Sequence, residues 1–148
     1  MGLLTNIFQT DLIQGLTLTI RYFFSKPVTL RYPEVRWEPP PRYRGAQVLK
    51  RHPDGKERCV GCGLCAEICP SSAIIIRTSE GEEHEKLIDF YQINLGLCIY
   101  CGFCQEVCPE DAVWMGNDYE LSVTDPFNLN VTKESMLTKG DDPRYEDL

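Results

Sequence analysis

Polar residues in the first 24 positions of the chain recur at the spacing of a helix. They follow one another at steps of three or four residues: Asn6, Thr10, Gln14, Thr17 and Arg21. Such steps place side chains on one face of a helix. Apolar side chains cover much of the remainder: Leu4, Ile7, Phe8, Leu12, Leu16, Leu18, Tyr22 and Phe23. We therefore predict an amphipathic helix from Leu3 to Phe24, with Asp11 interrupting its apolar side.

The polarity of this stretch limits where the helix can lie. A transmembrane helix needs about 20 predominantly apolar residues, and polar residues interrupt this stretch too often. It also lacks the basic start and the small-residue cleavage site of a secretory signal. The pattern leaves open a position in a membrane interface or on a membrane subunit, and packing against the chain's own domain.

The segment 26–58 is rich in proline: Pro27, Pro33, Pro39, Pro40, Pro41 and Pro53. This density excludes a regular helix and predicts extended or polyproline II backbone. Arginine and aromatic residues are interleaved with the prolines: Arg31, Tyr32, Arg36, Trp37, Arg42, Tyr43 and Arg44. Because these residue types are enriched at the centres of protein interfaces, we predict a docking arm rather than a solvated linker.

Short apolar segments separated by turns follow the arm. We predict strands at 73–77, 87–93 and 112–115, with the first two forming a hairpin around the polar loop 78–85. A short helix is predicted over 132–138, with Thr132 as its N-cap and Gly140 near its end. These elements indicate an α+β fold.

Residues 59–76 and 98–115 are two copies of one pattern. Eight of the 18 aligned positions are identical, and most others pair apolar with apolar residues, such as Val60 with Ile99. We expect two loop–helix–strand halves that pack about a pseudo-twofold axis. The chain then divides into an amphipathic helix (1–25), an extended arm (26–58), a repeat domain (59–116) and an acidic tail (117–148).

Charge is distributed unevenly along the 148 residues, whose net charge is −7. From Arg21 to Arg58 there are ten basic and four acidic residues, whereas Cys59 to Leu148 holds five basic and seventeen acidic ones. A basic arm joined to an acidic domain favours docking to a partner or an anionic surface. Nucleic acid is excluded as the partner, because the basic residues form neither a Lys/Arg-rich run nor a helical stripe.

All eight cysteines lie in the two copies of the repeat. Each copy reads C-x2-C-x2-C-x3-C-P, a spacing typical of 4Fe-4S ligation in which the fourth cysteine binds the cluster of the other copy. The predicted ligands of cluster 1 are Cys59, Cys62, Cys65 and Cys108. Those of cluster 2 are Cys98, Cys101, Cys104 and Cys69. Tyr100 stands where the first copy has Gly61, so we expect the two surroundings to differ.

Zinc and disulfides fit these cysteines less well. A structural zinc site takes four ligands in two C-x2-C pairs, which leaves the third cysteine and the following Cys-Pro step unexplained. Eight closely spaced cysteines without a secretory signal are metal ligands rather than disulfide partners. We therefore predict two 4Fe-4S clusters and one-electron transfer. With neither a phosphate-binding loop nor a dinucleotide fingerprint, we expect no direct NADH binding.

Beyond the cysteines, four segments resemble subunit I of bacterial NADH-quinone oxidoreductase, respiratory complex I, a family whose mammalian counterpart is the TYKY subunit. They read GLTLTIRYFFSKPVTLRYP, PPRYRG, ERCVGCGLCAEICP and INLGLCIYCGFCQEVCPEDAV. The cysteine spacing alone fits any dicluster ferredoxin, whereas the arm before it narrows the choice to this family.

The resemblance implies a ferredoxin-like domain that relays electrons from the NADH-oxidising end toward a terminal cluster and quinone, within a complex that translocates protons. It implies as partners the other subunits of the hydrophilic arm and the membrane subunit at the quinone site. The N-terminal helix would lie along the cytoplasmic side of the inner membrane. Three alternatives remain: a polyferredoxin subunit of a membrane-bound hydrogenase or ferredoxin-oxidising complex, a free soluble ferredoxin, and clusters that only stabilise the fold.

Overall fold

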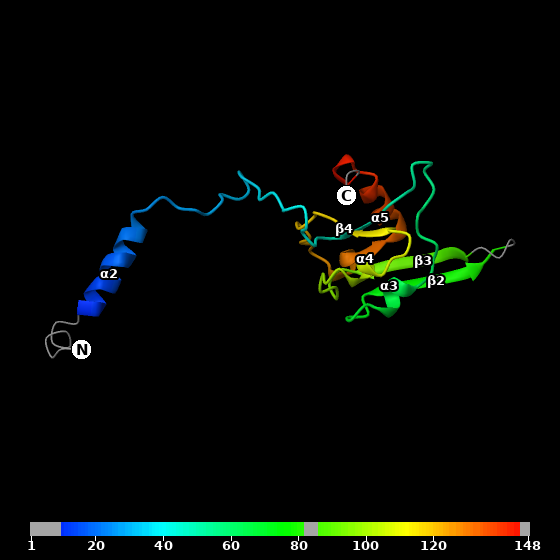
Figure 1. Cartoon of the computed structure of the whole chain (residues 1–148), viewed down its shortest axis with the longest axis horizontal. Coiled ribbons are helices and arrows are strands. Elements are labelled where there is room, and N and C mark those ends of the chain that lie inside the picture. Colours follow the sequence, from blue (N-terminus) through cyan, green and yellow to red (C-terminus); the bar gives the residue numbers. More distant parts are fainter. Residues whose placement is uncertain (1–9, 82–85, 146–148) are drawn as a thin grey trace. The chain divides into compact units, whose positions relative to one another are not determined.

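A computed structural model of the chain describes residues 10–81 and 86–145. The chain forms two compact units, Met1–Glu38 and Pro39–Leu148. The predicted amphipathic helix corresponds to α2 (Thr10–Phe23) in the first unit (Figure 1). Positions 3–9 of that prediction lie outside the described residues.

Helix α2 has no buried residue. Its large apolar side chains are exposed, with Leu12 at 67% and Leu16 at 60% of their full accessible surface. The hydroxyl of Thr17 donates to the Ile13 carbonyl, and that of Thr19 to the Leu16 carbonyl. The described part of this unit after Phe23 contains no helix or strand, as the prolines predict.

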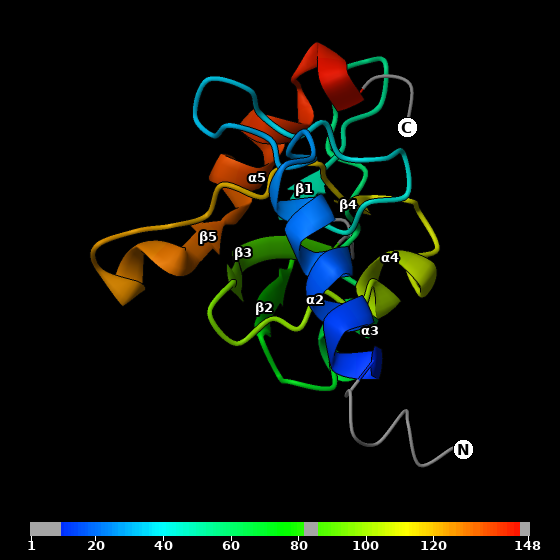
Figure 2. The ribbon, with the colours of Figure 1, turned by 90° about the vertical axis from the view of Figure 1, so that its left-hand side faces the viewer.

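The second unit is built from two small antiparallel sheets. In the first, β1 (Gln47–Leu49) pairs with β4 (Val113–Met115). In the second, β3 (Lys86–Asn94) lies between β2 (Ile74–Glu80) and β5 (Asn130–Thr132). The short helices are α3 (Leu64–Glu67), α4 (Phe103–Glu106) and α5 (Lys133–Gly140), with 3-10 turns η1 (Pro126–Leu129) and η2 (Pro143–Tyr145). Figure 2 shows α5 beside β1 and α4 beside β4.

The strands at 73–77, 87–93 and 112–115 are confirmed, as is the hairpin that joins the first two. Strand β2 runs to Glu80 and so takes up the beginning of the predicted polar loop, whose positions 82–85 lie outside the described residues. The helix after Thr132 is also confirmed, because the Thr132 hydroxyl accepts from the Ser135 N–H. The mixed helix and strand content agrees with an α+β fold.

The structure places the unit boundary earlier than the sequence predicted. Residues 39–58 belong to the second unit, because β1 lies within them and Gly45 N–H donates to the Gly116 carbonyl. Prolines are sparse after Pro41, and the run from Ala46 to Leu49 is buried. This run therefore forms a strand within the core instead of an extended arm.

Three of the described residues in the predicted acidic tail also belong to the core. Met136, Leu137 and Tyr145 are buried. Helix α5 packs on β1 so closely that a Cβ built on Gly140 would lie 1.9 Å from the Leu49 carbonyl oxygen. The acidic composition of 117–148 concealed these apolar residues, of which Met136 and Leu137 belong to the same buried cluster as Cys65 and Cys104.

Candidate metal centres

The two copies of the cysteine repeat adopt the same local backbone. Gly63 and Gly102 have left-handed conformations, both with φ of 82°, and each precedes a four-residue helix that carries the third cysteine. Left-handed backbone favours glycine because it has no Cβ. These helices, α3 and α4, contact each other and contain the buried thiols Cys65 and Cys104.

Gly61 in the first copy and Tyr100 in the second stand at equivalent positions and share a left-handed backbone conformation. Gly61 has φ of 66° and Tyr100 has φ of 53°. A Cβ on Gly61 would lie 2.8 Å from Cγ2 of Thr78, so the β2–β3 hairpin leaves no room for a side chain there. Tyr100 carries its ring in the equivalent place and packs against the core. The surroundings of the two copies differ, as the sequence predicts.

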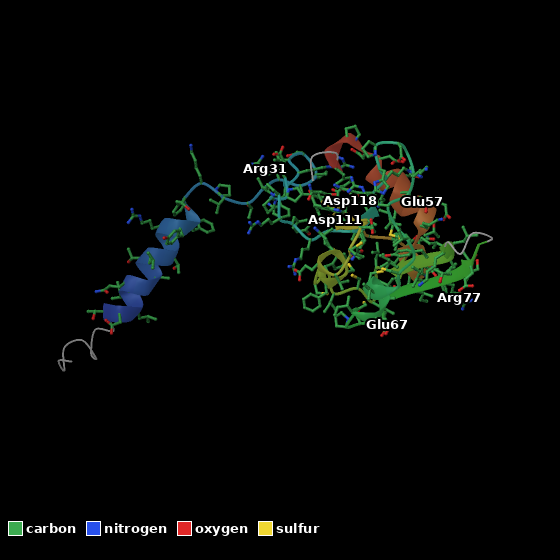
Figure 3. All side chains as sticks on the ribbon, turned by 45° about the vertical axis from the view of Figure 1, so that its right-hand side comes forward. Arg31, Glu57, Glu67, Arg77, Asp111 and Asp118 are labelled. Carbon is green, nitrogen blue, oxygen red and sulfur yellow. The ribbon has the colours of Figure 1, made fainter. Side chains whose placement is uncertain are left out.

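The thiols surround two cavities inside the second unit, and Figure 3 shows yellow sulfur atoms grouped in its interior. Cavity 1 is lined by Cys59, Cys62, Cys65 and Cys108. Cavity 2 is lined by Cys69, Cys98, Cys101 and Cys104. Each cavity thus gathers three thiols from one copy and one from the other.

Among the described residues, no group of three or more His, Cys, Asp or Glu side chains could hold a single metal ion. Four thiols spread around a cavity instead suit a cluster of several metals, because each thiolate then binds a different iron. The walls are otherwise mainly apolar, including Leu49, Ile76 and Val113 in cavity 1 and Ile74 and Ile99 in cavity 2. The residues present therefore fit two 4Fe-4S clusters.

Backbone N–H groups point at several sulfur atoms. Ala73 N–H donates to Cys69 Sγ over 3.3 Å, and Ala112 N–H donates to Cys108 Sγ over 3.2 Å. In the second copy, Tyr100 N–H donates to Cys98 Sγ over 3.4 Å. These donors favour the thiolate form that binds metal.

Two buried side chains also reach sulfur. The Gln47 Nε2 group donates to Cys98 Sγ over 3.1 Å in cavity 2. The Tyr91 hydroxyl lies 3.6 Å from Cys65 Sγ in cavity 1. The cysteine spacing did not identify either residue. Gln47 could have been noticed as the one polar residue in the run from Ala46 to Leu49.

Burial controls the acidity of the thiols. It raises the pKa of Cys104 to about 12 and also raises the pKa of Cys59 and Cys65. Burial acts in the same direction on Cys69, but hydrogen bonds from Ala73 and Ser71 outweigh it and lower the pKa of that thiol. Burial therefore favours the neutral thiols of Cys59, Cys65 and Cys104 in the metal-free chain, and metal binding must displace their protons.

The positively charged side chain of Arg44 lies against the second cysteine loop. Arg44 donates to the Cys101 carbonyl and pairs with Glu106, with 3.5 Å between Nη2 and Oε1. Gly102 makes room for this guanidinium, since a Cβ there would lie 3.1 Å from Arg44 Nε. Arg44 lies in the segment that the sequence assigned to the docking arm, but its contacts are with the cysteine loop.

The model of the 4Fe-4S dicluster domain family matches residues 58–112. NADH-quinone oxidoreductase subunit I 2 of Geobacter sulfurreducens is 49% identical over 126 residues, which are 85% of this chain and 72% of that protein. The subunit I of Helicobacter pylori strain G27 is 50% identical over 135 residues, which are 90% of this chain. The chain spans only 61% of the length of that Helicobacter protein.

The fold is also similar to a chain in the structure of the membrane-bound sulfane sulfur reductase, described as an archaeal respiratory membrane complex. The TM-score is 0.52 with 36% identity, over 72% of this chain and 53% of that one. None of the helices in the described part of the chain has the length and apolarity needed to cross a bilayer.

Proposed function

Because the chain belongs to the NADH-quinone oxidoreductase subunit I family, we propose that it carries single electrons through two 4Fe-4S clusters toward the quinone site of that complex. The observation that supports this most strongly is the pair of cavities, each lined by four cysteines. A 4Fe-4S cluster supplies a reversible one-electron redox centre when bound. The activity belongs to the whole complex, with NADH oxidation and proton translocation on other chains.

The ligand sets of this proposal are crossed. Cys59, Cys62 and Cys65 hold cluster 1 together with Cys108, and Cys98, Cys101 and Cys104 hold cluster 2 together with Cys69. The composition of the two cavities supports this assignment. The matching backbone of the two copies supports a pseudo-twofold relation between the halves.

The protein's own residues hold these centres in place and keep water away. Helix α3 carries Cys65 of cavity 1, helix α4 carries Cys104 of cavity 2, and the two helices contact each other, which favours a short electron path between the clusters. Apolar walls, including Leu49 and Val113, lower the local dielectric and exclude solvent. The N–H groups of Ala73, Tyr100 and Ala112 balance the negative charge on sulfur.

The first unit supplies the attachment in this proposal. Helix α2 lies in the interface on the cytoplasmic side of the inner membrane, against the membrane subunit at the quinone site. Its exposed leucines support this position, because burying such side chains in an interface is favourable. The arginines and aromatic residues of 26–38 dock on neighbouring subunits of the hydrophilic arm.

A second candidate is the corresponding subunit of another respiratory membrane complex, such as one that oxidises ferredoxin. The similarity to a chain of an archaeal respiratory membrane complex favours a membrane complex of this wider kind. The two candidates can be distinguished by isolating the complex from membranes through an affinity tag on this chain and adding either NADH or reduced ferredoxin. The proposal predicts that NADH reduces the two 4Fe-4S clusters of the isolated complex, so that the electron paramagnetic resonance (EPR) signals of the reduced clusters appear. Reduction by ferredoxin but not by NADH would replace it with the second candidate.

A further inference from the structure

Gln47 is a buried polar residue at a place where an apolar residue would pack more favourably. Only 2% of its surface is exposed, and its neighbours along the chain, Ala46, Val48 and Leu49, are also buried. Its side-chain Oε1 has no hydrogen-bond partner among the described residues. Burying an amide with one unpaired acceptor destabilises a fold, so packing does not explain this residue.

The other end of the same amide explains it. Nε2 lies 3.1 Å from Cys98 Sγ and the side chain lines cavity 2. A metal-bound thiolate carries no hydrogen and only accepts, so the amide must present its N–H₂ group to the sulfur. The unpaired Oε1 is the consequence of this orientation, since the carbonyl end of the amide then points away from the sulfur.

Strand β1 provides an internal comparison. Gln47 and Leu49 are two residues apart, so they lie on the same face of the strand. Gln47 lines cavity 2, whereas Leu49 lines cavity 1. One short strand thus offers an amide donor to one metal centre and an aliphatic side chain to the other. In cavity 1 the side chain near sulfur is the phenol of Tyr91, from strand β3.

We propose that Gln47 is a positioning residue that raises the reduction potential of cluster 2 by donating an N–H hydrogen bond to Cys98 Sγ. This inference rests on the proposed two-cluster function. Uptake of one electron makes the net charge of a cluster one unit more negative, and passing that electron to the next acceptor restores the original charge. Gln47 is neither oxidised nor reduced. Its N–H stabilises the more negative state, because hydrogen bonds to charged acceptors are the stronger ones.

The test is an EPR-monitored redox titration of the full-length chain loaded with iron and sulfide. In Gln47→Leu the donor is lost, and we expect the midpoint of one cluster to fall while the other is unchanged. The reduction equilibrium should weaken about tenfold, which is 59 mV for one electron. In Gln47→Glu the midpoint should fall further at high pH and recover at low pH, because a protonated carboxyl can donate again.

Two controls identify the cluster. Tyr91→Phe removes the hydroxyl near Cys65 and should move the other midpoint, the one that Gln47→Leu leaves alone. Val48→Ile changes the opposite face of the same strand, which lines neither cavity, without adding an N–H donor, and should move neither midpoint. A Gln47→Leu chain with the wild-type iron content and both midpoints unchanged would overturn the inference. A wild-type chain without two reducible clusters would overturn the proposed function itself.

If the Gln47→Leu chain loses iron, its midpoints cannot be compared with those of wild type. The Gln47→Glu variant then decides, because it keeps the shape of the side chain. If Gln47→Glu binds iron normally and its midpoints are independent of pH and equal to those of wild type, the amide has only a packing role. A midpoint that returns to the wild-type value at low pH, where the protonated carboxyl can donate again, supports the proposal. A midpoint that changes with pH but stays at or below the Gln47→Leu value at low pH reports only the charge of the carboxylate and contradicts it.

Discussion

Cys108 lines the same cavity as Cys59, although the two residues belong to different copies of the repeat. Cys69 has the equivalent place beside Cys98 in the other cavity. Under the proposed crossed ligation, each copy is incomplete as a metal site, and neither half of the domain binds a four-ligand cluster alone. The metal would then be part of the fold, because binding either cluster would tie the two halves together.

Replacing Cys69 tests the crossing of the ligands. Cys69→Ser should weaken or remove the EPR signal of the cluster held by Cys98, Cys101 and Cys104, and leave the signal of its own loop. Cys101→Ser should affect the same signal, whereas Cys62→Ser should affect the other one. If Cys69→Ser and Cys62→Ser remove the same signal, each copy binds its cluster with its own four cysteines.

Removing the metal tests its contribution to stability. After chelation of iron, we expect the second unit to lose its cooperative thermal transition in circular dichroism. The reason is that folding would then bury the thiols of Cys65 and Cys104 without the bonds that hold the halves together. A sharp transition of the metal-free chain, close in temperature to that of the loaded chain, would show that the protein core suffices.

Gly61→Ala tests the close approach of the β2–β3 hairpin to the first cysteine loop. The new methyl group would lie 2.8 Å from Thr78 Cγ2 at a residue with φ of 66°. We expect a loss of about 2 kcal/mol in the free energy of unfolding, from the contact and the backbone strain together. Urea denaturation of the loaded chain measures it.

Gly55→Ala is the matched control for this change. Gly55 also has a positive φ, 84°, but nothing lies within 4 Å of the position that its Cβ would take. This variant should show only the backbone strain, about 1 kcal/mol. Equal losses in both variants would mean that the hairpin does not crowd the loop.

A charge on the apolar side of α2 should weaken membrane attachment. Leu12→Glu places a carboxylate where the proposal buries a leucine, and we expect binding to anionic vesicles to fall by at least tenfold, since burying such a side chain contributes about 2 kcal/mol. Gln14→Glu adds the same charge on the polar face and should have a much smaller effect. Similar losses in a vesicle flotation assay would argue for electrostatic attraction alone.

Gly140→Ala tests whether the C-terminal segment is part of the core. Its Cβ would collide with the Leu49 carbonyl of β1, so α5 must move away and uncover Met136 and Leu137. We expect a loss of about 3 kcal/mol in unfolding free energy. Gly15→Ala, in open space on α2, should be neutral or stabilising for its helix. Wild-type stability of Gly140→Ala would show that the segment packs only loosely.

The sequence predicted the features that depend on residues close together in the chain, namely strands, a capped helix and the cysteine motifs. Short apolar segments separated by turns located β2, β3 and β4, and the Thr132 cap located α5, because these signals are local. The crossed ligand sets, which the sequence predicts from the motif, stay a prediction that the lining of the two cavities supports. The expected change of surroundings at Tyr100 also followed from aligning the copies.

The sequence did not predict long-range packing. Strand β1 is only three residues long and acquires its structure by pairing with β4, far along the chain, so no local pattern marked it. The composition of 117–148 pointed to an acidic tail, because the few buried residues, such as Met136 and Tyr145, are outnumbered by charged ones. The donors Gln47 and Tyr91 were missed for the same reason, since only folding brings them to sulfur.

The most direct test of the two-cluster account is the iron and acid-labile sulfide content of the purified full-length chain after anaerobic loading. The account predicts about eight iron and eight sulfide atoms per chain, four of each for every cluster. About four of each, or zinc in place of iron without sulfide, would contradict it.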